Sequence, residues 1–172
     1  AGLTYNVAGP LGIGDLEAIT EHLEAKGKTA GPPFMIGVDA NQDWMGDGER
    51  VLASMMKRVD FGVYQAVEAV VNGTFEGGVQ VLGPNNGGIK MSGEAELADF
   101  ITFGINGGKI TESDRGRITD NWLAMRSAVP SWIWDAVDEL SAKIGSGEVE
   151  VPCVWCADSI DQIRADWPDN VD

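Results

Sequence analysis

Phe34-Met35-Ile36-Gly37-Val38 is an apolar run that stops at Asp39, and it predicts a short buried strand. A similar run at residues 4–8 predicts an earlier strand, which breaks into the glycine-rich stretch Gly9-Pro10-Leu11-Gly12-Ile13-Gly14. A helix with Asp15 as its N-cap is expected between the two strands. Its apolar face is formed by Leu16, Ile19 and Leu23. This order of elements is typical of a βαβ unit, so we predict an α/β fold with a parallel, Rossmann-like sheet.

The next segment favours a strand and then a helix. Residues 51–56 fit both strand alternation and a helical stripe, and we favour a strand with Lys57 at its end. From about Asp60, valines and alanines recur with a 3.6-residue period until Asn72-Gly73. A further strand is expected at residues 79–82.

The C-terminal part is less regular. A tight turn at residues 85–88 precedes Ile89-Lys90-Met91, and residues 92–117 are rich in glycine and charge, so no regular element is assigned there. A helix is expected over residues 131–144, and residues 148–151 are expected to be extended. The inward positions of that helix are Ile133, Trp134, Val137 and Leu140.

The composition is that of a folded domain with an acidic surface. Of the 172 residues, 44% are hydrophobic and 23% are charged, and the net charge is −15. This charge argues against nucleic acid or an anionic membrane surface as partner, because both require clustered Lys and Arg. No apolar run approaches the roughly 18 residues needed to cross a bilayer.

Candidate binding residues lie where predicted strands end, which is where open α/β sheets bind ligands. Gly9 begins a loop that is either a tight turn or a place where backbone N–H groups approach a ligand. Asp39 could accept two hydrogen bonds from a vicinal diol, or cap the following turn. Lys57 could donate to a ligand, or be a solvated charge paired with Asp60.

Groups for catalysis or metal binding are missing from the pattern. The single histidine, His22, lies beside Glu21 and Glu24 on a helix and is expected at the surface. Cys153 and Cys156 have CxxC spacing but do not start a helix after a strand, so they are interpreted as a local disulfide or two free thiols. Half of a zinc site is the remaining alternative, but two ligands are lacking. The sequence therefore predicts no enzyme, no cofactor and no metal site, and an enzyme on a Rossmann-like sheet is the least favoured class.

Several longer motifs are similar to the basic membrane protein family of substrate-binding lipoproteins, which includes purine nucleoside receptors of ABC importers. The resemblance spans roughly residues 3–152 and covers the C-terminal half of that family. It is carried by Gly37-Val38-Asp39-Ala40-Asn41-Gln42, Val51-Leu52-Ala53-Ser54-Met55-Met56-Lys57-Arg58-Val59-Asp60, Val63-Tyr64-Gln65-Ala66-Val67, Asn72-Gly73-Thr74-Phe75-Glu76-Gly77-Gly78-Val79 and Ile144-Gly145-Ser146-Gly147-Glu148-Val149-Glu150-Val151-Pro152.

The resemblance implies a type I periplasmic binding protein, in which two α/β lobes close on a ligand by a hinge. Residues 1–48 and 97–152 would form the C-terminal ligand-binding lobe. Residues 51–92 would cross to the N-terminal lobe, which is only partly present here. Residues 153–172 would be an extra tail.

The resemblance also implies a function. Asp39 would hold ribose hydroxyls, Lys57 would contact the sugar side and Gly9 would lie against the ligand, while aromatic side chains would stack on the base. The protein would be an extracytoplasmic, lipid-anchored, non-catalytic receptor for a nucleoside. Its partners would be an ABC permease and a missing N-terminal half or a second chain. The alternative is a ligand-sensing or interaction protein of the same fold that does not serve a transporter.

Overall fold

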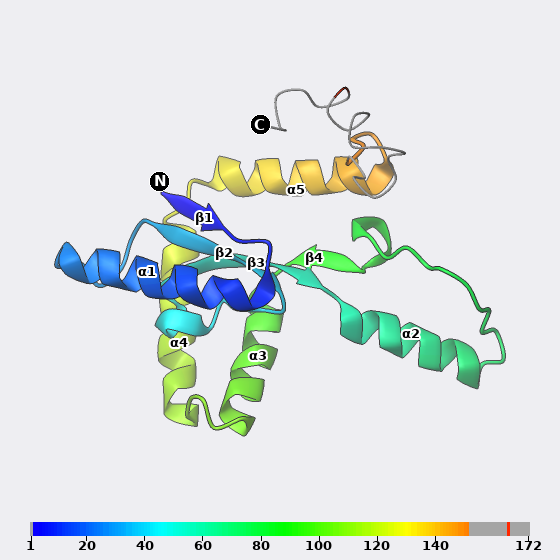
Figure 1. Ribbon diagram of the computed structural model, residues 1–172, viewed down its shortest axis with the longest axis horizontal. Helices are drawn as coiled ribbons and strands as arrows, with labels where there is room; N and C mark the ends of the chain where they lie inside the picture. The colour runs from blue at the N-terminus through cyan, green and yellow to red at the C-terminus, as the bar shows by residue number, and fades with distance from the viewer. Residues whose placement is uncertain (1, 152–164, 166–172) are drawn as a thin grey trace.

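The structure, a computed structural model, describes residues 2–151 and residue 165. Its four-stranded sheet has the order β1 (Leu3–Tyr5), β2 (Phe34–Asp39), β3 (Val51–Lys57), β4 (Ile89–Met91) (Figure 1). The first three strands are parallel, and β4 is antiparallel to β3. The predicted α/β class with a mainly parallel sheet is confirmed. The cysteines at 153 and 156 lie outside the described residues.

Helices cover both faces of the sheet, and the alternation of side chains along the strands decides which helix each residue meets. Met35 and Val51 are buried against α1 (Gly12–Ala25). The adjacent Phe34 and Leu52 pack on the opposite side, against a core between α3 (Glu94–Asn106) and α4 (Arg115–Ser127). That core consists of Leu97, Ile101, Ile118, Trp122 and Met125. Burial on both faces explains why the strands are continuously apolar rather than alternating.

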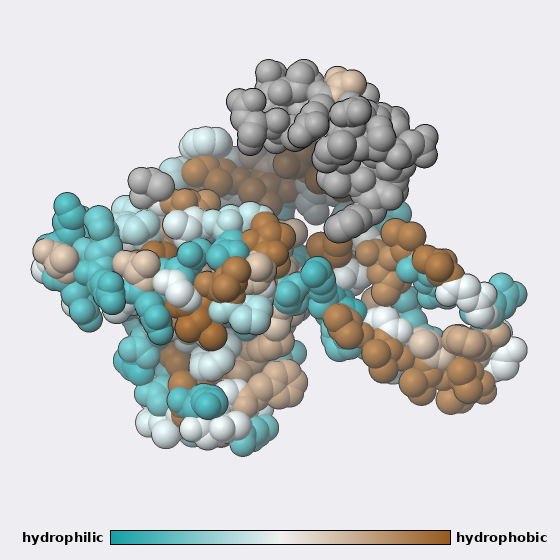
Figure 2. All heavy atoms as spheres, viewed as in Figure 1, coloured by the Kyte–Doolittle hydropathy of each residue, from teal (hydrophilic) through white to brown (hydrophobic). Residues whose placement is uncertain are grey.

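One segment projects from this body as an arm, defined here as residues 59–88. It contains α2 (Val59–Val71) and the return to β4 (Figure 1). No residue of α2 is buried, although the helix has the predicted valine stripe. Apolar side chains are therefore exposed along the arm (Figure 2). They include Val59, Val63, Val67, Val70, Val71, Phe75, Val79 and Val81.

The strand predicted at residues 79–82 is wrong, because the structure leaves this segment irregular. A strand needs a neighbour for its backbone hydrogen bonds, and the described residues place none beside it. No helix is predicted in the glycine- and charge-rich residues 92–117, but this segment contains the whole of α3 and the start of α4. The predicted N-cap Asp15 is also wrong, since α1 begins at Gly12 and Asp15 lies in its first turn.

The last helix, α5 (Ser131–Ser146), is confirmed, and it contacts η3 (Pro84–Asn86) at the end of the arm. Trp134 lies against Arg126, whose guanidinium carbon is 4.1 Å from the centroid of that ring and 4.6 Å from the centroid of Trp122. Two of the positions expected to face inward are wrong, because Val137 and Leu140 are exposed. Trp134 contacts Arg126 of α4, whereas Val137 and Leu140 lie further along α5.

Candidate functional site

Asp39 ends β2 with an unusual backbone. Its φ of 69° lies in the left-handed region, which aspartate tolerates better than most residues because its short side chain bonds locally. The chain turns at this point, where the N–H of Ala40 donates to the carbonyl of Val38 at 2.9 Å. The turn directs the Asp39 carboxylate over the carboxyl ends of the parallel strands.

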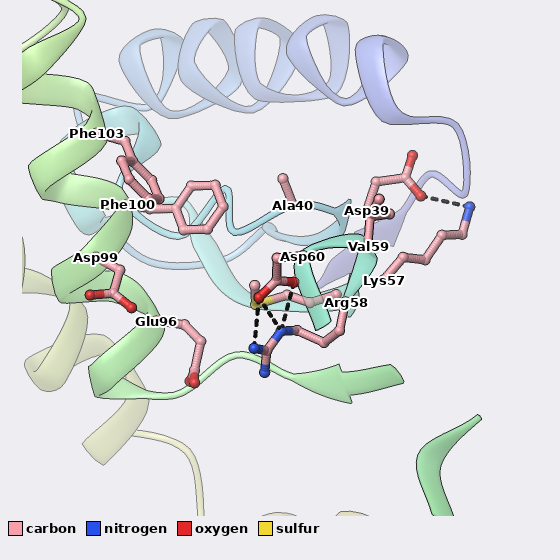
Figure 3. A pocket seen from close by; sticks show the side chains of 11 residues that line it. Asp39, Ala40, Lys57, Arg58, Val59, Asp60, Glu96, Asp99, Phe100 and Phe103 are labelled. Carbon is pink, nitrogen blue, oxygen red and sulfur yellow. Dashed lines mark hydrogen bonds and ion pairs between the residues drawn. The ribbon is translucent and has the colours of Figure 1, made fainter. Parts of the chain in front are cut away.

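Lys57 reaches that carboxylate from the neighbouring strand. Asp39 pairs with Met56 in the sheet register, so the next residue of β3 lies beside it. The Lys57 Nζ is 2.7 Å from Asp39 Oδ1 (Figure 3). The hydrogen bond to Asp39 raises the pKa of Lys57, which keeps the ammonium charged. The Lys57 side chain is 65% exposed and that of Asp39 is 45% exposed, so water screens the pair and it contributes little to folding.

The alternative pairing of Lys57 with Asp60 is wrong. Asp60 is held instead by Arg58, whose Nη2 donates to Asp60 Oδ2 at 2.7 Å and whose Nε donates to Oδ1 at 3.0 Å. This fork geometry suits a guanidinium better than an ammonium. Both cations are close to Asp60 in the sequence, but Lys57 at the end of β3 pairs with Asp39 and Arg58, just before α2, pairs with Asp60.

Gly9 closes the third side of the site. A β-carbon at Gly9 would lie 2.9 Å from Asp39 Oδ2, so the loop after β1 touches the carboxylate. Gly12 has a different role, because its β-carbon would meet Cε of Met35 at 2.8 Å, which allows α1 to pack on β2. A β-carbon at Gly14 would meet no atom of another part of the structure within 4 Å. Of these three glycines only Gly9 borders the site, and the structure brings it together with Asp39 and Lys57.

Gln42 holds these pieces in place, a role that the sequence did not indicate. Its Oε1 accepts a hydrogen bond from the N–H of Val38 at 3.1 Å, and its Nε2 donates to the carbonyl of Gly9 at 3.5 Å. Its own N–H donates to Oγ of Ser54 at 3.0 Å. Gln42 therefore links the Gly9 loop, the end of β2 and the middle of β3.

A buried carboxylate lies beneath the site. Asp43 accepts hydrogen bonds from Ser54 Oγ at 2.5 Å, Ser92 Oγ at 2.6 Å and Trp122 Nε1 at 3.0 Å. Burial raises the pKa of Asp43, and these donors oppose that rise, as does the charge of Arg126. The network joins β3, the residue after β4 and α4, so it fixes the base of the site.

The site opens into a cavity of about 630 Å³ (Figure 3). Asp39 and Lys57 line one end, Arg58 and Asp60 the middle, and α3 the opposite wall. The side chains that α3 contributes are Glu96, Asp99, Phe100 and Phe103. The two phenylalanine rings meet edge to face, with centroids 5.4 Å apart.

Ion pairs keep two carboxylates of this cavity charged. Burial would raise the pKa of Glu96, but hydrogen bonds from Lys90 at 2.7 Å and from the N–H of Gly93 at 3.0 Å lower it overall. The hydrogen bonds from Arg58 lower the pKa of Asp60. Side chains of this kind accept hydrogen bonds and are poor proton donors near neutral pH.

The α3 wall is the part of the site that sequence reasoning missed. The signal was present, because Leu97, Ile101 and Gly104 recur at helical spacing and are buried. The cavity-lining residues Glu96, Phe100 and Phe103 recur three and four residues apart on the next face. In residues 2–151 no group of three or more His, Cys, Asp or Glu side chains is arranged to hold a metal ion. None of the described helices is both long and apolar enough to span a membrane.

The chain is similar in sequence to uncharacterized lipoproteins of three Pyrococcus species. It is 32% identical over 167 residues to one from Pyrococcus furiosus, 31% over 150 residues to one from Pyrococcus abyssi and 29% over 164 residues to one from Pyrococcus horikoshii. These matches cover 95%, 87% and 95% of this chain, but only 40%, 36% and 40% of the relatives. The chain thus spans about two fifths of the length of the relatives it matches. No family model matches it.

The fold is similar to that of a solved ABC transporter solute-binding protein from Aeropyrum pernix. The TM-score is 0.78 at 30% sequence identity, over 96% of this chain and 43% of that one. The expected likeness to solute-binding proteins is thereby confirmed, whereas the narrower resemblance to the basic membrane protein family stays a prediction. The chain is therefore similar in sequence to Pyrococcus lipoproteins and in fold to an ABC transporter solute-binding protein.

Proposed function

We propose that this chain is part of an extracytoplasmic solute-binding protein of the basic membrane protein type, which delivers a nucleoside to an ABC permease unchanged. The observation that carries the proposal is the convergence of Asp39, Lys57 and Gly9 at the carboxyl edge of the parallel strands. The similarity to the Aeropyrum pernix protein supports the transport role. The Pyrococcus lipoproteins support a lipid-anchored location outside the cytoplasm.

The chemistry of the three residues suits a ribose. A carboxylate accepts hydrogen bonds from two neighbouring hydroxyls, so Asp39 can hold a vicinal diol. The Lys57 ammonium has three donors, and those not directed at Asp39 can reach a sugar oxygen. Because Gly9 has no side chain, the sugar can lie against the backbone of its loop.

The same site is suited to binding rather than to chemistry. Asp60 and Glu96 are ion-paired, with lowered pKa values, so they stay charged and do not supply protons. Lys57 stays cationic beside Asp39 and is therefore a poor nucleophile. The pocket thus offers fixed charges and hydrogen-bonding groups that orient a ligand.

The proposed receptor has two lobes. Residues 1–48 and 97–152 belong to one lobe, and within residues 51–92 the arm extends toward the second, while β3 and β4 remain in the sheet of the first. The exposed valine face of α2 supports this division, since an apolar helical face is normally buried against another element. The second lobe is supplied by the N-terminal part of the protein or by another chain, and it covers the open side of the cavity.

The test is a substitution of Asp39 that leaves its backbone unstrained. Asparagine tolerates the left-handed region as well as aspartate does, so Asp39→Asn removes the charge without forcing the turn to move. Calorimetry on the protein expressed from its full reading frame should show an affinity for nucleosides at least about tenfold lower in this variant. Free sugars serve as ligand controls.

Asp47→Asn is the matched control variant. Asp47 also has a positive φ, 59°, and it is also ion-paired, with Arg117 Nη1 at 2.9 Å, but it does not line the cavity. Its substitution should leave nucleoside affinity unchanged. Equal affinity of Asp39→Asn and the parent protein would refute the site. Nucleoside binding without any loss of nucleoside uptake in a deletion strain would favour the alternative, a sensing protein of the same fold.

A further inference from the structure

The two ends of the cavity differ in chemistry. The end at Asp39 and Lys57 presents a charged pair. The opposite end, on α3, presents two aromatic rings and carboxylates (Figure 3). Aromatic rings favour contact with a planar group, so a ligand whose polar part lies at Asp39 would extend a planar part toward α3.

The carboxylates near that wall differ in whether they already accept hydrogen bonds from other residues. Asp60 is held by Arg58, and Glu96 accepts hydrogen bonds from Lys90 and Gly93. Within the described residues Asp99 makes no side-chain hydrogen bond and no ion pair, although the positive charge of Arg58 is close enough to act on it. Its oxygens are therefore free to accept hydrogen bonds from a ligand.

Asp99 also lies beside the aromatic pair. It precedes Phe100 and is four residues before Phe103, which places it on the same face of α3 as the second ring. All three residues line the same cavity, and in Figure 3 the two rings extend toward its centre while Asp99 lies beside them on α3. A planar group resting on the rings would thus present its edge to a carboxylate.

We infer that Asp99 selects the nucleobase, and that it favours a base whose edge carries two adjacent N–H donors, as guanine does. The inference rests on the proposed function, because it places the sugar at Asp39. An ionised carboxylate only accepts hydrogen bonds, and its two oxygens can take two parallel donors at once. Guanine offers such a pair, the ring N1–H and the exocyclic 2-amino group.

Other bases fit this carboxylate less well. Hypoxanthine lacks the 2-amino group and offers the ring N–H alone. Xanthine carries a carbonyl oxygen at that position, and this acceptor would be repelled by the carboxylate oxygen. Adenine places a ring-nitrogen acceptor next to its amino group. A site built to accept two donors discriminates against analogues that lack one, because its polar group is then left unpaired.

Calorimetry with guanosine, inosine and xanthosine tests the inference on the full-length protein. The parent should bind guanosine about tenfold more tightly than inosine, because one additional hydrogen bond to a charged acceptor raises affinity by about tenfold or more. Xanthosine should bind more weakly than either. In Asp99→Asn the preference for guanosine over inosine should fall to about twofold or less, while inosine affinity stays within about threefold of the parent value.

Glu94→Gln is the matched control. Glu94 is an exposed carboxylate in the first turn of the same helix and does not line the cavity, so its loss should leave the guanosine preference intact. Equal affinity of the parent for guanosine and inosine would overturn the inference alone. So would a guanosine preference that survives Asp99→Asn. Absence of binding to all three nucleosides would overturn the proposed function as well.

Discussion

Gly9 and Asp39 are in direct contact, because a β-carbon on Gly9 would lie 2.9 Å from Oδ2 of Asp39. The contact fixes the carboxylate between the Gly9 loop on one side and Lys57 on the other. The contact also explains why a small residue is needed at position 9. The φ of Gly9 is not in the left-handed region, so the requirement comes from the close approach of the Asp39 carboxylate and not from the backbone conformation.

Gly9→Ala should therefore weaken nucleoside binding without unfolding the protein. The added methyl group displaces the Asp39 carboxylate from Lys57, and we expect an affinity about tenfold lower by calorimetry. Gly14→Ala is the control, because a β-carbon there meets no atom within 4 Å. It should keep the affinity and stabilise α1 by about 0.5–1 kcal/mol. Equal affinities of the two variants would contradict the contact.

Asp43→Ala should lower stability strongly. Ser54, Ser92 and Trp122 would each lose the acceptor of a buried hydrogen bond. Buried donors without acceptors cost about 1–3 kcal/mol each before the structure relaxes, so we expect a loss of about 3 kcal/mol or more in urea unfolding. Asp43→Asn retains one acceptor oxygen and should lose less. A loss below about 1 kcal/mol in Asp43→Ala would show that the network is dispensable.

The same carboxylate has a consequence for pH. Because burial raises the pKa of Asp43, the folded state binds its proton more tightly than the unfolded state does. The stability from this group is present below the ordinary value of 3.8 and is lost as the pH rises through the folded value. The stability difference between the parent and Asp43→Asn should therefore shrink between pH 4 and pH 7. A difference that grows over this range would reverse the assigned direction.

Asp114 should have the opposite pH behaviour. Hydrogen bonds from Thr111, and then from Arg117, lower the pKa of Asp114 to about 2. Its contribution is present above the ordinary value of 3.8 and is lost as the pH falls toward 2. In Asp114→Asn the melting temperature should fall less steeply with acid than in the parent. A melting temperature that falls as steeply with acid in Asp114→Asn as in the parent would contradict the lowered pKa of Asp114.

The valine face of α2 yields a prediction about the second lobe. Val63 and Val67 are exposed here, by 60% and 58%, so lysines at both positions would cost little if the face meets only water. If the face packs on a second lobe, the double substitution should lower the melting temperature of the full-length protein by several degrees. Glu68→Gln, on the same helix, should leave the melting temperature unchanged. An unchanged double variant would refute the packing.

The end of β2 could be predicted because an apolar run that stops at a charge is a local pattern. The periodicity of apolar residues predicts both β2 (Phe34–Asp39) and α2 (Val59–Val71). Such periodicity indicates a face that is suited to burial, whether or not another element covers it. The positions of Asp39 and Lys57 also followed, since both lie at strand ends. That they touch each other depends on the register of β2 and β3, which no local pattern encodes.

The α3 wall could not be predicted in the same way. The segment contains three glycines and several charges, a composition typical of a loop; the glycines are Gly104, Gly107 and Gly108. For this reason no helix is predicted there, although Leu97 and Ile101 are at helical spacing. The helix packs against α4 through Leu97 and Ile101, and this tertiary contact is not visible in a local pattern. The prediction of a strand at residues 79–82 is wrong for the opposite reason. The β-propensity of these residues is strong, but the described residues contain no partner strand for them.

The two strands that connect the body to the arm share one anchor. Ser54 of β3 and Ser92 after β4 both donate to Asp43, and the N–H of Ser92 also donates to the carbonyl of Ser54 at 2.8 Å. Both strands that lead into the arm are therefore tied to the same buried carboxylate, while η3 of the arm also contacts α5. A movement of the arm would thus be passed to Asp43, which follows Asp39, the residue that we propose holds the ligand, by four positions in the chain.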